Sequence, residues 1–276
     1  MQTDYVFVHP REGLSLEECD FYHTMDLPGT GLIHGLFDLR STIESYLGNF
    51  QFKQKRVLEI GTASGFVCFS MERAGAEVIA YDLSPDFNWD MVPYAKLDIA
   101  ALREERRSHI GRLNNSFWFA HQKFESRAKV VYGTVYQIPP EIGLVDVTII
   151  NSVLLHVRDP FLAMQQAASL TKETMIVTDA YGWGNPTGWK RWLIDKLQGY
   201  KSTMRFLPDY RNNSPTETWW YLTPEVIQEC LGVLGFEQSV VTNHEHLYTN
   251  KGTQQTKVPM FTIVATRTAG RPNSVA

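Results

Sequence analysis

Short apolar runs alternate with helical stretches along much of the chain, and the clearest such unit lies in its first third. Residues 56–60 form a β-rich run, and Phe66–Ala74 is a helical stretch. A second apolar run at 77–81 closes on Asp82. A strand, a glycine-containing turn, a helix and a second strand in this order predict a βαβ unit with parallel strands and a right-handed crossover.

The alternation continues toward the C-terminus, where five more apolar runs predict strands. These runs cover residues 128–132, 145–150, 174–178, 236–242 and 258–267. The last two are joined by a polar linker, which we expect at the surface, and they predict a terminal antiparallel pair. The fold class is therefore α/β: a Rossmann-like, doubly wound and mostly parallel seven-stranded sheet that ends in this strand pair.

Three segments do not fit the strand and helix alternation, and they set the domain organisation. Residues 1–50 precede the sheet and predict an N-terminal helical cap. Residues 86–127 form a first insertion that is mostly helical, and residues 180–222 form a second insertion. Both interrupt one domain that spans 51–268, and 269–276 is a tail.

The second insertion is rich in aromatic residues. It contains five of the seven tryptophans and four tyrosines: Trp183, Trp189, Trp192, Trp219, Trp220, Tyr181, Tyr200, Tyr210 and Tyr221. These rings either form a lid that shapes a hydrophobic or planar acceptor pocket, or make up the core of the insertion itself. Tyr181 and Trp183 follow the fifth strand directly, so we expect them to face a substrate at that edge of the sheet.

Composition excludes several classes of protein. With 43% hydrophobic and 20% charged residues the chain is globular, and its net charge of -4 argues against a surface that binds phosphate backbones throughout. The N-terminus lacks a signal peptide pattern, and no window is apolar enough to span a membrane. Three scattered cysteines, Cys19, Cys68 and Cys230, predict neither disulfides nor a metal site. We expect a cytoplasmic protein; the oligomeric state is not readable.

The glycine turn after the first strand of the unit indicates a ligand. Gly61 and Gly65 permit a tight turn and a close approach of the backbone to a bound group. Asp82 lies 21 residues after Gly61, where a carboxylate can accept hydrogen bonds from both hydroxyls of a ribose. An ordinary turn between a strand and a helix is the alternative. Together the two features favour an adenosine-type ligand at the carboxyl edge of the sheet.

The charge and spacing of the turn distinguish between adenosine ligands. A dinucleotide fingerprint requires G-x-G-x-x-G, and residues 59–65 read Glu-Ile-Gly-Thr-Ala-Ser-Gly. The Glu59 carboxylate would repel a pyrophosphate and attract a cationic amino group. S-adenosylmethionine (SAM) carries an ammonium and a sulfonium but no phosphate, so the turn favours SAM over NAD.

These residues resemble the first two motifs of the class I SAM-dependent methyltransferases. The resemblance rests on residues 57–65 and on Tyr81-Asp82-Leu83; Ala63 stands where the family often has glycine. Four other strings resemble a narrower group that contains the tRNA wobble-uridine carboxymethyl/methyltransferase: residues 21–27, 35–40, 151–160 and 219–224. The likeness extends from about residue 20 to residue 266.

The resemblance implies a cofactor site and no metal. It places the methionine end of SAM against Glu59 and the turn, the ribose on Asp82, the adenine beside Leu83 and the turn after the third strand, and the sulfonium above the residues after the fourth strand. The implied cofactor residues are Glu59, Gly61, Thr62, Ala63, Gly65, Asp82, Leu83, Gly133, Thr134, Val135, Asn151 and Ser152.

Methyl transfer is an in-line displacement, so the enzyme acts mainly by alignment, and a general base helps when the acceptor is a weak acid. His156 lies about one helical turn beyond Asn151 and is the candidate base, unless it only packs against the following helix. Arg40 and His34 in the cap are candidates to orient an acidic or phosphate-bearing acceptor; Arg40 could instead pair with a carboxylate. The mixed charges of residues 103–107 predict a solvated helix face more than an RNA contact.

The sequence thus favours a SAM-dependent methyltransferase that acts on a small molecule. The resemblance keeps a tRNA-modifying transferase as an alternative, although the chain lacks a dense stripe of Lys and Arg with interleaved aromatics. A SAM-binding protein without catalysis and an NAD-dependent oxidoreductase are further alternatives. Neither the acceptor nor the choice between plain and carboxylated SAM can be read from the residues.

Overall fold

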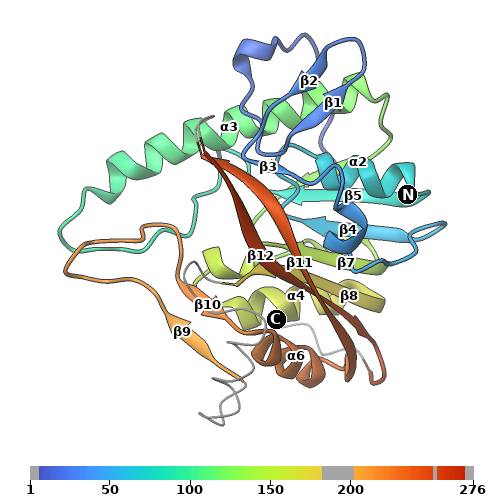
Figure 1. The fold of residues 1–276 in the computed structure, drawn as a ribbon, viewed down its shortest axis with the longest axis vertical. Helices are drawn as coiled ribbons and strands as arrows, with labels where there is room; N and C mark the ends of the chain where they lie inside the picture. The colour runs from blue at the N-terminus through green and yellow to red at the C-terminus, as the bar shows by residue number, and fades with distance from the viewer. Residues whose placement is uncertain (1–5, 182–201, 251–253, 271–276) are drawn as a thin grey trace.

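An eight-stranded sheet forms the centre of the protein (Figure 1). The computed structural model describes residues 6–181, 202–250 and 254–270. The strand order is β3-β11-β12-β8-β7-β4-β5-β6. The strands are β3 (Phe37–Asp38), β4 (Arg56–Ile60), β5 (Glu77–Asp82), β6 (Lys129–Tyr132), β7 (Val145–Asn151), β8 (Thr171–Ala180), β11 (Gln238–Asn250) and β12 (Gln254–Thr266).

Seven of these strands are those that the apolar runs predict, and the fold class is confirmed. Strands β6, β5, β4, β7 and β8 are parallel, whereas β12 is antiparallel to β8 and β11 is antiparallel to β12. β4 pairs with β5 on one side and with β7 on the other. The order of the chain reverses there, and the crevice at such a switch point is where open α/β sheets bind ligands.

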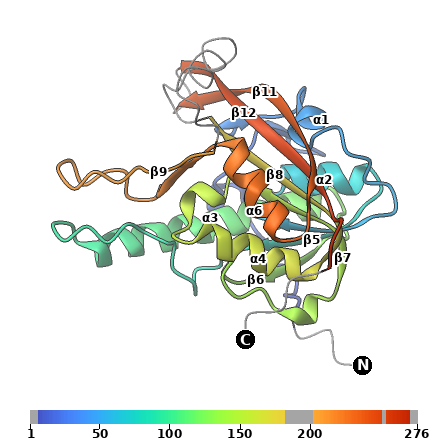
Figure 2. The same ribbon diagram turned by 90° about the horizontal axis from the view of Figure 1, so that it is seen from below.

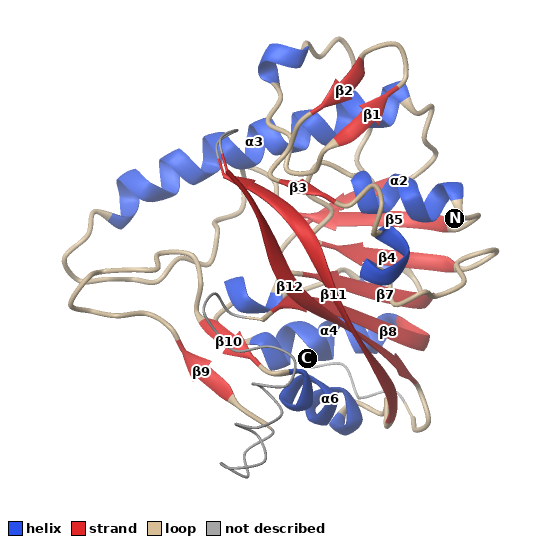
Figure 3. Cartoon of the chain, in the orientation of Figure 1, coloured by secondary structure: helices blue, strands red, loops and turns tan. Residues whose placement is uncertain are grey.

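Helices cover both faces of the sheet (Figures 2 and 3). The helices α2 (Phe66–Arg73) and α3 (Ile99–Lys123) pack on one face, and α4 (Pro160–Leu170) and α6 (Pro224–Val233) pack on the other. The last two begin alike, because the side chains of Asp159 and Thr223 accept hydrogen bonds from backbone amides of the first turn and a proline follows each.

The N-terminal segment differs from the expected helical cap. It contains a 3-10 turn, η1 (Leu16–Glu18), a hairpin of β1 (Met25–Leu27) and β2 (Gly31–Ile33), the short β3 and a one-turn helix, α1 (Ile43–Tyr46). The prediction of a helical segment is wrong because Pro28 and two glycines of positive φ, Gly29 and Gly31, form a hairpin turn. β3 pairs with β11 and adds the eighth strand.

The terminal strand pair is longer than predicted. Residues 243–257 were expected to form a polar surface linker, yet β11 runs on to Asn250 and β12 begins at Gln254. The expectation of a linker is wrong because the segment continues both strands of the pair; described side chains such as Glu245 and Lys257 are exposed, as expected, whereas His246 is buried. His246 is 1% exposed, and its ring lies 2.7 Å from Thr42 Oγ1 and 2.5 Å from the ring of His244.

The two insertions meet beside the sheet. The first contains the 25-residue α3, as expected, and the described part of the second contains an antiparallel pair, β9 (Met204–Phe206) and β10 (Trp220–Leu222). Figures 1 and 2 show the start of α3 and β9 extending from the body on the same side. Val92, Tyr94 and Trp219 form a small buried apolar cluster that joins the insertions. Among the described helices, none is long and apolar enough to cross a membrane.

Candidate active site

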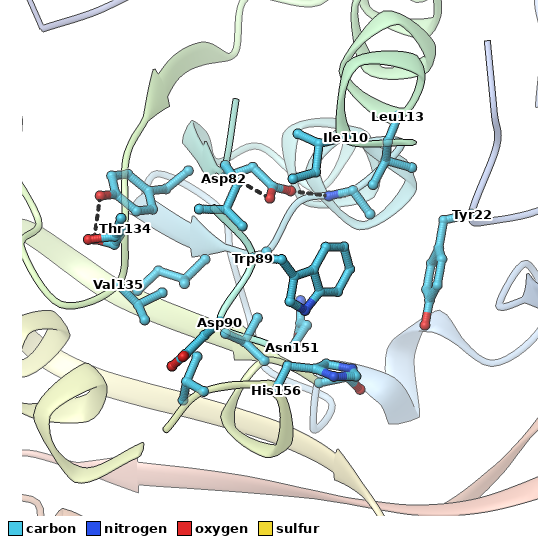
Figure 4. A pocket seen from close by; sticks show the side chains of 18 of the residues that line it. Tyr22, Asp82, Trp89, Asp90, Ile110, Leu113, Thr134, Val135, Asn151 and His156 are labelled. Atoms are coloured by element: carbon cyan, nitrogen blue, oxygen red, sulfur yellow. Dashed lines mark hydrogen bonds between the residues drawn. The ribbon is translucent and has the colours of Figure 1, made fainter. Parts of the chain in front are cut away.

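A cavity of about 360 Å³ opens at the carboxyl ends of four parallel strands (Figure 4). Its floor is formed by Gly61 after β4, Asp82 at the end of β5, Gly133 after β6 and Asn151 at the end of β7. The N-terminal segment, the loop that precedes α3, α3 itself and the turn η3 (Leu154–His156) complete the walls. The cavity therefore lies at the switch point that the strand order creates.

The turn after β4 brings backbone close to the cavity. Gly61 has a φ of +83°, and a Cβ at this position would lie 2.4 Å from a methyl carbon of Val153. Gly65 has a φ of +89° and caps α2. Glycine is therefore required at both ends of the turn. Ala63, which stands where glycine is frequent, adopts a positive φ of 50° without it.

Asp82 connects this turn to the neighbouring strand. One carboxylate oxygen accepts a hydrogen bond of 2.7 Å from the Ala63 amide, and the other accepts one of 2.7 Å from the Leu83 amide. Burial raises the pKa of Asp82 above its ordinary value, although the two amides act in the opposite direction. Ile110 and Leu113 of α3 lie beside Asp82, so the carboxylate is flanked by apolar side chains (Figure 4).

Buried polar atoms without partners lie behind the turn. Glu59 is fully buried, and one carboxylate oxygen accepts a hydrogen bond of 2.8 Å from the hydroxyl of Thr62. Its other oxygen and both polar side-chain atoms of Asn151 have no hydrogen-bond partner in the described residues. Burial, together with the nearby charge of Asp82, raises the pKa of Glu59 to about 8. Native proteins rarely leave such groups unpaired, so a polar ligand here would satisfy them.

His156 is held in one tautomer by the backbone. Its Nδ1 lies 2.6 Å from the carbonyl oxygen of Glu217. A carbonyl can only accept, so Nδ1 carries the proton and donates it, and Nε2 keeps a free lone pair. Burial lowers the pKa of His156, so the ring is neutral near pH 7. The ring lines the cavity and meets Trp89 edge-on at 5.9 Å (Figure 4).

Aromatic residues form the remaining wall. Tyr22, His23, Tyr46 and Trp89 all line the cavity, and the first three belong to the N-terminal segment. Burial raises the pKa values of Tyr22 and Tyr46 and lowers that of His23 to about 3, so all three are uncharged near pH 7. Nδ1 of His23 is buried and has no hydrogen-bond partner in the described residues. The wall is apolar and neutral, with hydroxyl and ring-nitrogen atoms available for hydrogen bonds.

A family model described as a methyltransferase domain matches residues 34–230. The match covers more than half of the sequence and spans all four strand ends of the cavity. The chain belongs to this methyltransferase family. It is a SAM-dependent class I enzyme, and SAM is its cofactor. No curated protein sequence matches the chain.

Solved structures of similar fold include two proteins of low sequence identity. The N-terminal domain of EvdMO1, in the presence of S-adenosylhomocysteine (SAH) and D-fucose, is 14% identical with a TM-score of 0.51, over 91% of this chain and 93% of that chain. The magnesium protoporphyrin IX methyltransferase ChlM from Synechocystis PCC 6803, with bound SAH, is 15% identical with a TM-score of 0.47, over 83% and 82%. The first likeness supports the Rossmann-like fold.

Most of the residues that the sequence predicts for the cofactor site of this methyltransferase are gathered at the cavity. Those that line it are Gly61, Ala63, Asp82, Leu83, Gly133, Thr134, Val135, Asn151 and Ser152. The candidate base, His156, lines it as well. Glu59, Thr62 and Gly65 do not line it and lie in and behind the turn. Sequence reasoning missed the cavity residues of α3, such as Ile110 and Leu113, and those of the N-terminal segment and the loop that holds Trp89. Tyr22 and His23 lie within a string that resembles the narrower group, which was the one available signal.

The predicted acceptor residues lie elsewhere, and their assignment is corrected. Arg40 and His34 do not line the cavity. The guanidinium of Arg40 binds Asp26 at 2.9 Å and Asp38 at 2.8 Å, so it connects the N-terminal hairpin to β3. The alternative that the sequence left open, a pair with a carboxylate, holds because Asp26 on β1 and Asp38 on β3 both contact the Arg40 guanidinium.

The aromatic residues of the second insertion also differ from their expected role. Tyr181 does not line the cavity; its ring packs on Phe261 at 5.0 Å and its hydroxyl donates to Asn243. Trp183 lies outside the described residues. Trp219 donates its ring N–H to the Asp90 carbonyl and so joins the two insertions, whereas Trp220 donates its ring N–H to the Arg158 carbonyl. In the part of the chain that the structure describes, no cluster of His, Cys, Asp and Glu is suited to a metal ion.

Proposed function

We propose that this enzyme transfers the methyl group of SAM to a hydroxyl of a small-molecule acceptor bound between His156 and the aromatic wall. The observation that carries the proposal is the free lone pair on Nε2 of His156, which lines the same cavity as Asp82. A neutral imidazole with one unprotonated nitrogen is suited to take a proton from a weakly acidic acceptor.

The residues at the strand ends fit SAM in kind. The Asp82 carboxylate faces the cavity and suits a pair of ribose hydroxyls, and Leu83, Ile110 and Leu113 offer apolar contacts to an adenine. The unpartnered atoms of Asn151 and Glu59 suit the polar methionine end. Because Glu59 is an acid, this site favours a cationic ligand group over a pyrophosphate.

The protein's contribution to the reaction is alignment and proton transfer. When bound, SAM supplies an electrophilic methyl group on a sulfonium. Nε2 of His156 accepts the proton that the acceptor hydroxyl loses, while the Glu217 carbonyl stabilises the ring by accepting from Nδ1. Tyr22 and Tyr46 stay protonated, so they orient the acceptor by hydrogen bonds and do not compete as bases. Alignment and base catalysis together contribute most of the rate in such a transfer.

The surface supports a small acceptor over tRNA. The net charge is -4, and two arginines in the first half of α3 pair with acids. Arg106 pairs with Glu217, and Arg107 lies 3.6 Å from Glu104. A binder of phosphate backbones needs cations whose charge is not already compensated. The competing acceptor is tRNA, which rests on the likeness to the wobble-uridine group, and the following experiment includes it.

The test combines cofactor binding with methyl transfer. SAH and SAM, but not NAD, should raise the melting temperature by several degrees at ~100 times their dissociation constants. Tritiated SAM should label compounds in a small-molecule hydroxyl library and not bulk tRNA. His156→Gln should lower turnover roughly 10²- to 10⁴-fold and keep the SAH shift. Label on tRNA would overturn the small-molecule acceptor. Full turnover by His156→Gln would overturn the assignment of His156 as the base.

A further inference from the structure

A half-buried ion pair joins the two insertions. Arg106 on α3 contacts the carboxylate of Glu217, which precedes β10. Their side chains are only 26% and 22% exposed, so both charges have lost most of their water. Nε of Arg106 is buried without a hydrogen-bond partner in the described residues. Desolvation of this kind offsets much of the attraction between the charges, so stability alone gives a weak reason for the pair.

The segment that holds Glu217 also holds the candidate base. We call residues 215–219 the clasp. The Glu217 carbonyl accepts from Nδ1 of His156 at 2.6 Å, and the Trp219 amide donates to the Leu155 carbonyl at 2.8 Å. Two backbone groups of the clasp therefore bind η3. The side chain of Glu217 points to α3 while its carbonyl fixes the histidine ring.

The clasp is also bonded to the loop that covers the cavity. The Thr216 carbonyl accepts from the Val92 amide at 2.9 Å, and the ring N–H of Trp219 donates to the Asp90 carbonyl at 2.6 Å. The same loop places Trp89 in the cavity, edge-on to His156 (Figure 4). Among the described residues, the ion pair with Arg106 ties the side chain of Glu217 to α3, and it adds to the hydrogen bonds that hold the clasp.

From these contacts we propose that Arg106 and Glu217 are positioning residues for His156, an inference that rests on the proposed base. The ion pair holds the clasp so that the Glu217 carbonyl keeps the proton on Nδ1 and leaves Nε2 free for the acceptor. Without the pair the carbonyl moves away, the imidazole exchanges between its two tautomers, and only part of the enzyme presents a free Nε2. Neither residue touches the reacting atoms.

The test observes the histidine directly, so it needs no known acceptor. Ring nitrogen signals of ¹⁵N-histidine-labelled enzyme report which nitrogen carries the proton, and His156→Asn identifies the signals of His156. Wild type should show a protonated Nδ1 and an unprotonated Nε2. Arg106→Met and Glu217→Gln should shift both signals toward averaged values, and Arg106→Lys should restore them in part. Arg107→Met is the matched control, because Arg107 is exposed on the same helix and its ion pair among the described residues is with the exposed Glu104.

Two further readouts separate positioning from general damage. The SAH melting shift should be unchanged in every variant, because the cofactor residues lie on the strand ends. Turnover of any acceptor found should fall roughly 10- to 100-fold in Arg106→Met, with the KM for SAM unchanged. Wild-type ring signals in both Arg106→Met and Glu217→Gln would overturn the inference. Altered signals with full turnover by His156→Gln would sink the proposed base and leave the positioning intact.

Discussion

Glu59 holds an ionisable carboxyl group with none of its surface exposed to solvent. Its pKa is raised to about 8, chiefly by burial, while in the unfolded chain it titrates near 4.5. The unfolded state therefore releases a proton that the folded state keeps, and folding stability falls as pH rises between these values. This loss of folding stability occurs at the turn where the proposed site places the cationic amino group of SAM.

Glu59→Gln should therefore stabilise the ligand-free enzyme. At pH 8 we expect the free energy of unfolding to rise by on the order of 2 kcal/mol, because the neutral amide has no charge to desolvate. The same change should reduce the SAH-induced melting shift, since it removes the negative charge behind the turn. Melting curves at pH 5 and pH 8, with and without SAH, measure both effects. Glu105→Gln, at an exposed position of α3, is the control and should leave them unchanged.

The elements differ in how far their sequence predicts them. The central strands are buried on both faces, so their unbroken apolar runs indicate them directly. Strand topology then places the strand-end residues of the site together, which is why Asp82 and Asn151 were predictable. Tyr22 and Trp89 reach the cavity from loops whose course depends on tertiary contacts, and no periodic pattern encodes such a path.

The terminal hairpin shows why polar segments are harder. Residues 243–257 are hydrophilic, yet they extend β11 and β12, and His244 is hydrogen-bonded to both His246 and Thr262. A single polar residue can be buried when a partner from a distant element satisfies it. Thr42, 204 residues away from His246 in sequence, is such a partner, and only the folded chain reveals it.

The histidine pair of β11 should make stability sensitive to acid. Burial lowers the pKa of His244 to about 3 and that of His246 to about 4, against about 6.5 in the unfolded chain. Below pH 6.5 the unfolded state binds protons that the folded state refuses, so stability is lost as pH falls. We expect a loss of roughly 2–4 kcal/mol between pH 7 and pH 5.

Urea unfolding at several pH values measures this loss. The double variant His244→Gln, His246→Gln should flatten the dependence of unfolding free energy on pH, even where it lowers stability at every pH. The exposed His34 serves as the matched control, because His34→Gln should keep the wild-type slope. A double variant with an unchanged slope would show that other groups cause the acid sensitivity.

At the scale of the whole molecule, ligand binding should act on one edge of the sheet only. The cavity collects the carboxyl ends of four strands and the roof loop at residues 88–91. SAH should therefore slow hydrogen exchange in residues 61–65, 133–135 and 151–153. Residues 140–144, at the opposite edge of the sheet, should exchange as before. Equal protection at both edges would mean general tightening of the fold and not occupation of this cavity.

The wall formed by Tyr22 and Tyr46 has a consequence for how the enzyme is made. Both tyrosines belong to the start of the chain, but the Tyr46 carbonyl accepts a hydrogen bond from Thr262, 216 residues later, and β3 pairs with β11. Contacts of such long sequence separation form late, because closing the intervening chain costs entropy first. On the ribosome, the wall formed by Tyr22 and Tyr46 cannot complete these contacts until β11 and β12 have emerged. We therefore expect the cofactor to bind late in synthesis, after the N-terminal segment has packed against the C-terminal strands.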